Sequence, residues 1–202
     1  MNKYTKKNYI TKDRWNNFFY QIKGVRFFEG AESVLEIGVG NKIVSDTLKK
    51  LGFDVKTLDI DRELEPDIIS SADNMPVEDK SFDVVVACEI LEHLPFEKFE
   101  KCLSEIKRAA KMGAVISLPH AGYTFSLSFK IPLIKWKRVI CKIPHFWRSK
   151  TSTSEHYWEP GLKGYPVSKI KNTIKKAGFE IQRSFIGPDD PSHIFFILKI
   201  FE

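Results

Sequence analysis

A short run of mostly β-branched residues constrains the fold of this chain more than any other feature. Residues 83–88 read Asp-Val-Val-Val-Ala-Cys, with no glycine or proline inside the run. A continuous apolar strand of this kind is typical of a parallel sheet that is covered on both faces. The run therefore predicts a central strand with helices packed above and below it.

Predicted helices and strands alternate along the rest of the chain. Apolar spacing predicts helices over 11–28, 41–51 (capped by Asn41), 96–110 and 168–177, and strands over 33–37, 55–58, 114–118, 179–186 and 194–201. Residues 187–192 join the last two strands and are too few for a parallel crossover, so those strands are expected to pair antiparallel. The pattern predicts a doubly wound, mostly parallel α/β sheet that ends in an antiparallel hairpin.

The length of 202 residues fits one domain, 1–202, with an N-terminal helical extension over 1–30 and an insertion over 120–165. Three cysteines lie far apart without a CxxC pair, which argues against a disulfide framework or a zinc site. No metal site is expected. The cysteine usage and the lack of a signal-peptide or membrane-spanning run predict a cytoplasmic location.

Two glycines follow the first predicted strand, in the segment Val34-Leu35-Glu36-Ile37-Gly38-Val39-Gly40. Glycine in a strand-to-helix turn allows close approach to a ligand. Glu36 would repel a pyrophosphate but suits the cationic amino acid moiety of an adenosyl-methionine ligand. Asp59 ends the second strand, where a carboxylate can accept hydrogen bonds from ribose hydroxyls. A nicotinamide-dependent reductase is the competing interpretation, and both Glu36 and Ile43 count against it.

Between Ser33 and Pro119 the chain resembles a class I S-adenosylmethionine-dependent methyltransferase, of the broad kind called type 11, with a Rossmann-like fold. The residues that carry the resemblance are 34–40, Leu58-Asp59-Ile60-Asp61, 71–77, 81–85 and Glu89-Ile90-Leu91-Glu92-His93-Leu94. Their order and spacing agree jointly with the family. One departure is Lys42, near which such enzymes usually carry a further glycine.

The resemblance implies S-adenosylmethionine as cofactor and a set of residues that bind it. Asp73 would accept from the adenine amine, with Asn74 and Met75 lining the ring. Asp59 would bind the ribose, and Ile60 belongs to the same set of cofactor-binding residues. Glu36, Gly38 and Gly40 would line the methionine and sugar, and Cys88 and Glu89 would lie beside the sulfonium. The competing interpretation of Asp73-Asn74 is a simple turn before Pro76. Asp61 is expected to face solvent or to cap a helix.

Methyl transfer needs a positioned nucleophile and, for a hydroxyl or ammonium acceptor, a general base. The candidates are His93, His120, Tyr123 and His156. His120 follows the fifth strand on the ligand side and is favoured as substrate-facing, with a loop histidine that caps a carbonyl as the alternative. His156 could be a base oriented by Glu155, or part of an exposed polar turn, and His93 is expected to be structural. The Asn/Asp-Pro-Pro-aromatic element does not follow Cys88, which disfavours nucleobase methylation.

Residues 122–148 mix aromatic and aliphatic side chains with bases, and 120–154 carry seven Lys or Arg and no acid. The composition suits, in order of preference, a lid over a lipophilic anionic substrate, an amphipathic helix on an anionic membrane surface, or a nucleic-acid surface. Pro132 and Pro144 exclude one long helix. The simplest alternative is a subdomain that buries most of these apolar groups against the core.

We therefore expect methyl transfer to an oxygen, and less favourably a nitrogen, of a small or lipid-like acceptor. Peripheral membrane contact would run through 122–148. Nucleic acid is disfavoured as a partner, and no stable protein partner is inferred. The alternative from another class is a non-catalytic binding or scaffold module that retains the fold.

Overall fold

A computed structural model describes residues 4, 9–130, 132 and 137–200 of the chain. Its elements are α1 (Lys12–Val25), β1 (Ser33–Ile37), α2 (Ile43–Lys50), β2 (Asp54–Asp59), η2 (Arg62–Leu64), β3 (Ile68–Ile69), β4 (Phe82–Cys88), η3 (Leu91–His93), α3 (Phe96–Ala109), β5 (Ala110–Pro119), β6 (Gly122–Phe129), β7 (Lys137–Pro144), α4 (Val167–Lys176), β8 (Phe179–Gly187) and β9 (Asp190–Ile200). None of the helices in these residues has the length and apolar composition that crossing a membrane requires.

Seven strands form one sheet in the order β3-β2-β1-β4-β5-β9-β8. β1 pairs parallel with β2 and β4, and β4 pairs parallel with β5. β9 runs antiparallel to both β5 and β8. The doubly wound sheet with its final antiparallel hairpin is confirmed.

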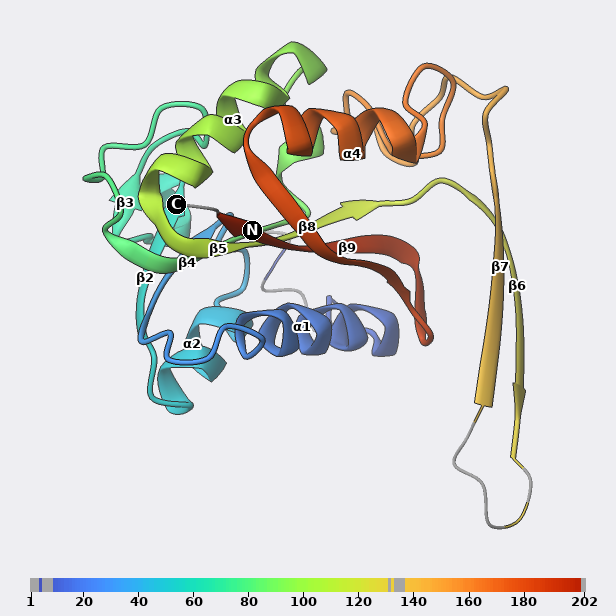
Figure 1. The fold of residues 1–202 in the computed structure, drawn as a ribbon, viewed down its shortest axis with the longest axis horizontal. Helices are drawn as coiled ribbons and strands as arrows, with labels where there is room; N and C mark the ends of the chain where they lie inside the picture. The colour runs from blue at the N-terminus through green and yellow to red at the C-terminus, as the bar shows by residue number, and fades with distance from the viewer. Residues whose placement is uncertain (1–3, 5–8, 131, 133–136, 201–202) are drawn as a thin grey trace.

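Helices cover both faces of the sheet, with α1 and α2 on one side and α3 and α4 on the other (Figure 1). One core lies under α3 and α4 and includes Phe99, Ile106, Trp158 and Ile174. The other lies under α1 and α2 and includes Val25 and Leu48. The run Val84–Ala87 is fully buried between the two layers, as a central strand requires.

Two details of the expected elements were wrong, and one strand of the main sheet was not predicted. The loop between the last two strands is shorter than 187–192, because β8 extends to Gly187 and β9 already begins at Asp190. The second helix begins at Ile43 with Lys42 as its cap residue, although the Asn41 side chain still accepts from the amide of Ile43. The strand β3 was not predicted, because its two residues are too few to show the apolar pattern of a strand.

In its described residues, the insertion forms neither a helix nor a packed subdomain. β6 and β7 form a two-stranded antiparallel sheet of their own, which projects away from the main sheet (Figure 1). Tyr123, Phe125, Leu127 and Phe129 alternate with Thr124, Ser126 and Ser128, so they lie on one face, and Ile143, Cys141 and Val139 lie opposite the first three of them. The large apolar residues of this face are 40–66% exposed. The alternative that these groups are buried against the core was wrong, because a two-stranded ribbon leaves a whole face uncovered.

Candidate functional site

A cavity of about 1190 Å³ opens at the carboxyl ends of β1, β2, β4 and β5. This is the edge where ligands bind in open α/β sheets. Of the cofactor residues expected from the sequence, Glu36, Gly38, Gly40, Asp59, Ile60, Cys88 and Glu89 line it. The candidate bases His93, His120 and His156 line it as well. The structure therefore brings residues from distant parts of the chain to one chamber.

The glycine loop turns the chain from β1 into α2. Gly38 has φ +83°, and a Cβ there would lie 3.2 Å from the side chain of Ile90, so the turn favours glycine twice over. Asp59 Oδ2 accepts from the amide of Val39 at 2.9 Å, and its Oδ1 accepts from the amide of Asp61 at 2.9 Å. Asp59 thus ties the loop to the end of β2. Asp61 caps η2, which confirms its expected role as a cap.

Lys42 also adopts a left-handed conformation, with φ +63°. This is the position near which the family usually has a further glycine. Its Nζ donates to the carbonyl of Glu65 at 3.1 Å and so lies away from the turn. A left-handed conformation at a lysine costs backbone strain.

Glu36 is buried at the end of β1, and within the described part of the chain its Oε2 has no hydrogen-bond partner. Burial raises the pKa of Glu36 to about 8, and a contact with Ser45 opposes the rise only partly. A buried carboxyl with an unused oxygen facing a cavity is suited to a cationic ligand group, which would satisfy the oxygen and favour its ionised form.

The segment Asp73-Asn74-Met75 is placed differently from the other cofactor residues. Asp73 Oδ2 lies 3.0 Å from Lys98 Nζ, and hydrogen bonds from Ser71 and then Lys98 lower the pKa of Asp73. The amide of Asn74 donates to the carbonyl of Ser71, which forms a turn, and Met75 packs in the core. In the described structure these three residues do not line the cavity.

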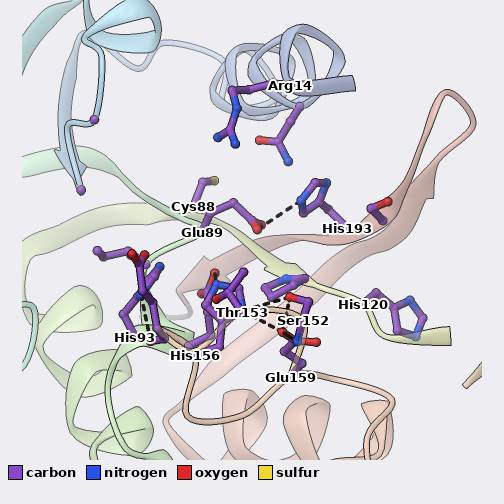
Figure 2. A pocket seen from close by; sticks show the side chains of 18 of the residues that line it. Arg14, Cys88, Glu89, His93, His120, Ser152, Thr153, His156, Glu159 and His193 are labelled. Carbon is purple, nitrogen blue, oxygen red and sulfur yellow. Dashed lines mark hydrogen bonds and ion pairs between the residues drawn. The ribbon is translucent and has the colours of Figure 1, made fainter. Parts of the chain in front are cut away.

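A network of acid and base side chains lies at the cavity, and the sequence patterns did not predict it. His193 on β9 has its Nε2 3.3 Å from Glu89 Oε2 (Figure 2). Its Nδ1 lies 2.5 Å from Asp190 Oδ1. Asn17 Nδ2 donates to the other oxygen of Asp190 at 3.2 Å. Ser117 Oγ donates to Oε1 of Glu89 at 2.7 Å. His193 is thereby fixed between two carboxyl groups, directly beside the end of β4.

The pKa values of His193 and Glu89 both lie above their ordinary values. Burial lowers the pKa of His193, but the charges of Glu89 and Asp190 outweigh it, and the net pKa lies above the ordinary value. Burial raises the pKa of Glu89, which His193 and Ser117 oppose. A carboxyl and an imidazole in contact can take up a proton as one unit.

His156 lies in a further group with Glu92, His93 and Glu159 (Figure 2). Its Nδ1 is 2.7 Å from Oε1 of Glu159, so the orienting acid is Glu159 and the expected orienting role of Glu155 was wrong. Glu155 contributes its carbonyl oxygen, 3.2 Å from Nδ1 of His93. The amide and hydroxyl of Ser152 donate to Glu159.

His120 is buried at the end of β5, and neither ring nitrogen has a hydrogen-bond partner among the described residues. It is therefore not a cap of a carbonyl. Burial, assisted by the charge of Lys142, lowers the pKa of His120 to about 4, so the ring is neutral at physiological pH. Burial raises the pKa of the Cys88 thiol, which is therefore unreactive.

Comparison with known proteins agrees with this geometry. Residues 35–118 match the family model described as a methyltransferase domain. A search of the curated proteins found no match to the sequence.

Three solved structures are similar in fold. A S-adenosylmethionine-dependent methyltransferase from Clostridium acetobutylicum has a TM-score of 0.63 at 11% identity, over 96% of this chain and 93% of that chain. The 1,6-didemethyltoxoflavin-N1-methyltransferase of Burkholderia thailandensis, with 1,6-didemethyltoxoflavin and S-adenosylhomocysteine bound, has a TM-score of 0.63 at 11% identity, over 95% of this chain and 82% of that chain. A glycopeptide N-methyltransferase in complex with S-adenosylmethionine has a TM-score of 0.61 at 10% identity, over 93% and 94%.

The sheet order and the similar solved structures show the Rossmann-like fold of class I methyltransferases. Residues 35–118 match a methyltransferase domain, and this match supports an enzyme that uses S-adenosylmethionine as its cofactor.

Proposed function

We propose that the chain transfers the methyl group of S-adenosylmethionine to an oxygen of a small or lipid-like acceptor. The observation that carries the proposal is the contact between Glu89 and His193, which puts an acid–base pair in the same cavity as the glycine loop. Pockets for a single drug-sized ligand measure roughly 300–1,000 Å³. The volume of about 1190 Å³ supports room for an acceptor beside the cofactor.

In the cofactor half, Glu36 would bind the ammonium group of the methionine moiety, which satisfies its unused oxygen. Gly38 and Gly40 would allow the backbone to approach the ligand, and Asp59 with Ile60 would hold the ribose. Asp73, with Asn74 and Met75, would bind the adenine. Asp73 must then exchange its contact with Lys98 for the adenine amine.

In the acceptor half, the hydroxyl oxygen of the acceptor would attack the methyl carbon as the carbon–sulfur bond breaks, and the sulfur keeps the bonding electron pair. The Glu89–His193 pair would take up the hydroxyl proton. His120 is neutral and buried with both nitrogens unused by the described residues, so it would contact the acceptor rather than act as the base. His156 stays the second candidate base.

The hairpin of β6 and β7 supports a lipid-like acceptor. Its base contributes Gly122, Thr124 and Lys142 to the cavity wall, and Arg148 follows them, so cationic side chains border the acceptor half. The exposed apolar face farther along the hairpin would contact the lipid surface that holds the acceptor, as aromatic and basic groups do at anionic membranes.

Calorimetric titration with S-adenosylmethionine and S-adenosylhomocysteine tests the cofactor half. We expect both to bind, and we expect Asp59→Ala to weaken both. Asp54→Asn is the matched control, because Asp54 is exposed at the opposite end of the same strand. Absence of binding to the wild-type chain at high micromolar ligand would overturn the proposal.

Transfer of a labelled methyl group to small hydroxyl compounds and to lipid extracts tests the acceptor half. Label in an acid- and base-stable ether is the expected product. Cofactor binding without transfer to any acceptor would favour a binding module that retains the fold, and label on nitrogen would overturn the choice of oxygen.

A further inference from the structure

Glu92, His93 and His156 come together in the cavity from two distant segments. One carboxylate oxygen and one ring nitrogen from each histidine lie within 4.8 Å of one another. Nε2 of His156 is 3.9 Å from Oε1 of Glu92, and the two imidazole centroids are 4.8 Å apart. Figure 2 shows the two labelled rings side by side below the end of β4.

Glu92 is completely buried, and no described residue donates a hydrogen bond to either of its carboxylate oxygens. A buried carboxyl that lacks donors is costly, and such groups are normally paired or bound to a metal ion. Among the described residues, Glu92 therefore lacks the partner that a buried carboxyl normally has.

Each histidine of the cluster is oriented through its Nδ1. Glu159 holds Nδ1 of His156 at 2.7 Å, and Glu159 is itself held by the amide and hydroxyl of Ser152. The carbonyl of Glu155 lies 3.2 Å from Nδ1 of His93, and a carbonyl can only accept, so this nitrogen carries the hydrogen. In both rings Nε2 is then the nitrogen with the lone pair. Histidines that bind metals are oriented by carboxylates and carbonyls in this way.

We propose that Glu92, His93 and His156 bind one divalent first-row transition-metal ion, with Glu159 and the Glu155 carbonyl as the groups that orient the histidines. Two imidazoles and one carboxylate suit zinc, cobalt, manganese or iron better than magnesium, which prefers oxygen ligands. Two nitrogens bound to one zinc ion lie about 3.4 Å apart, so small side-chain rotations complete the site.

This site goes beyond the proposed function, because methyl transfer requires no metal, and it uses no cysteine ligand. It lies on the acceptor side, three residues beyond Glu89. With three protein ligands, the ion would keep open positions for an oxygen of the acceptor.

Metal titration of the whole chain, without S-adenosylmethionine, tests the proposal. The chain is treated with chelator, and Co²⁺ is added while the visible absorption of the ion is recorded. We expect one Co²⁺ per chain, displaced by one Zn²⁺, and a rise in the melting temperature with either ion. Glu92→Gln and His156→Gln should each abolish the stoichiometric binding.

Glu159→Gln tests the orienting role and should weaken binding roughly 10–100-fold without abolishing it. His145→Gln is the matched control, a histidine outside the cluster, and should bind as the wild-type chain does. Folding of each variant is checked by circular dichroism of the metal-free chain. Binding that is substoichiometric in the wild-type chain, or equal in the wild-type chain and well-folded Glu92→Gln, would overturn the site. Because no cofactor is present, this result is independent of the methyl-transfer proposal.

Discussion

His193 Nε2 lies 3.3 Å from Glu89 Oε2, which joins the beginning of the last strand to the end of the central strand β4. Ser117 donates a hydrogen bond to Glu89, and Asp190 contacts the other ring nitrogen of His193. The contact gives the acceptor half of the cavity an acid–base pair whose two members are 104 positions apart in the sequence.

His193→Gln removes the imidazole and keeps a side chain that can hydrogen-bond to Glu89. We expect kcat for methyl transfer to fall about 10²- to 10⁴-fold, with little change in the affinity for S-adenosylmethionine. The wild-type rate should fall as pH drops through the raised pKa of the pair, because the protonated pair cannot accept the acceptor's proton. Steady-state kinetics of both proteins across pH checks this. If kcat of His193→Gln falls toward low pH in the same way as kcat of the wild-type chain, the pair is not the base.

Glu36→Gln should change how stability depends on pH. The folded-state pKa of Glu36 is about 8, above its ordinary value, so the folded chain retains a proton that the unfolded chain has lost. The associated stability is complete below the unfolded pKa and declines as pH rises toward 8. The glutamine variant lacks this loss and should be more stable than the wild-type chain at pH 8 to 9, by on the order of a few kcal/mol.

Urea unfolding at pH 5, 7 and 9 measures this difference. Glu32→Gln is the control, because Glu32 is exposed just before β1. Glu36→Gln should also weaken S-adenosylmethionine and S-adenosylhomocysteine to a similar extent, since both carry the ammonium group. A selective loss of S-adenosylmethionine would instead place Glu36 at the sulfonium.

Substitutions of Lys42 test the strain in the glycine loop. Lys42 has φ +63°, a conformation that costs a non-glycine residue about 1–2 kcal/mol. Lys42→Gly should therefore be neutral or stabilising, whereas Lys42→Val should destabilise the chain, because a β-branched side chain tolerates this region least. Thermal unfolding of the two variants measures the difference. Equal melting temperatures would show that the loop relaxes when the side chain changes.

Phe125→Ser with Leu127→Ser tests the exposed face of the β6–β7 hairpin. We expect sedimentation with anionic vesicles to fall, because both side chains are more than half exposed on the apolar face. Thr124→Ser, on the other face, should bind as the wild-type chain does. Equal sedimentation of the double variant would remove the membrane role, and unchanged binding in high salt would remove the contribution of the basic residues.

Much of the fold could be predicted because the parallel strands carry local patterns. A few neighbouring residues are enough to recognise the buried strand Val84–Ala87, the glycines after Ile37 and Glu36 at the strand end. The hairpin was missed although Tyr123, Phe125, Leu127 and Phe129 alternate with polar residues, a strand signal that the basic and aromatic composition obscured.

The partners of Glu89 and His156, which the sequence did single out, could not be predicted for a different reason. His193 reaches Glu89 only because β9 pairs with β5 in a register that sets His193 opposite Pro119. His156 reaches Glu92 through a loop whose path leaves no periodic pattern. Such contacts depend on pairing between distant segments, which local residue patterns do not encode.

The position of β9 between β5 and β8 has a consequence for synthesis of the protein. The strand that carries His193 leaves the ribosome after every other strand of the sheet, yet it occupies an interior place in the strand order. A nascent chain that ends before Asp190 exposes the edges of β5 and β8 and lacks the partner of Glu89. The glycine loop can therefore form during translation, whereas the contact between Glu89 and His193 can form only when translation has passed β9.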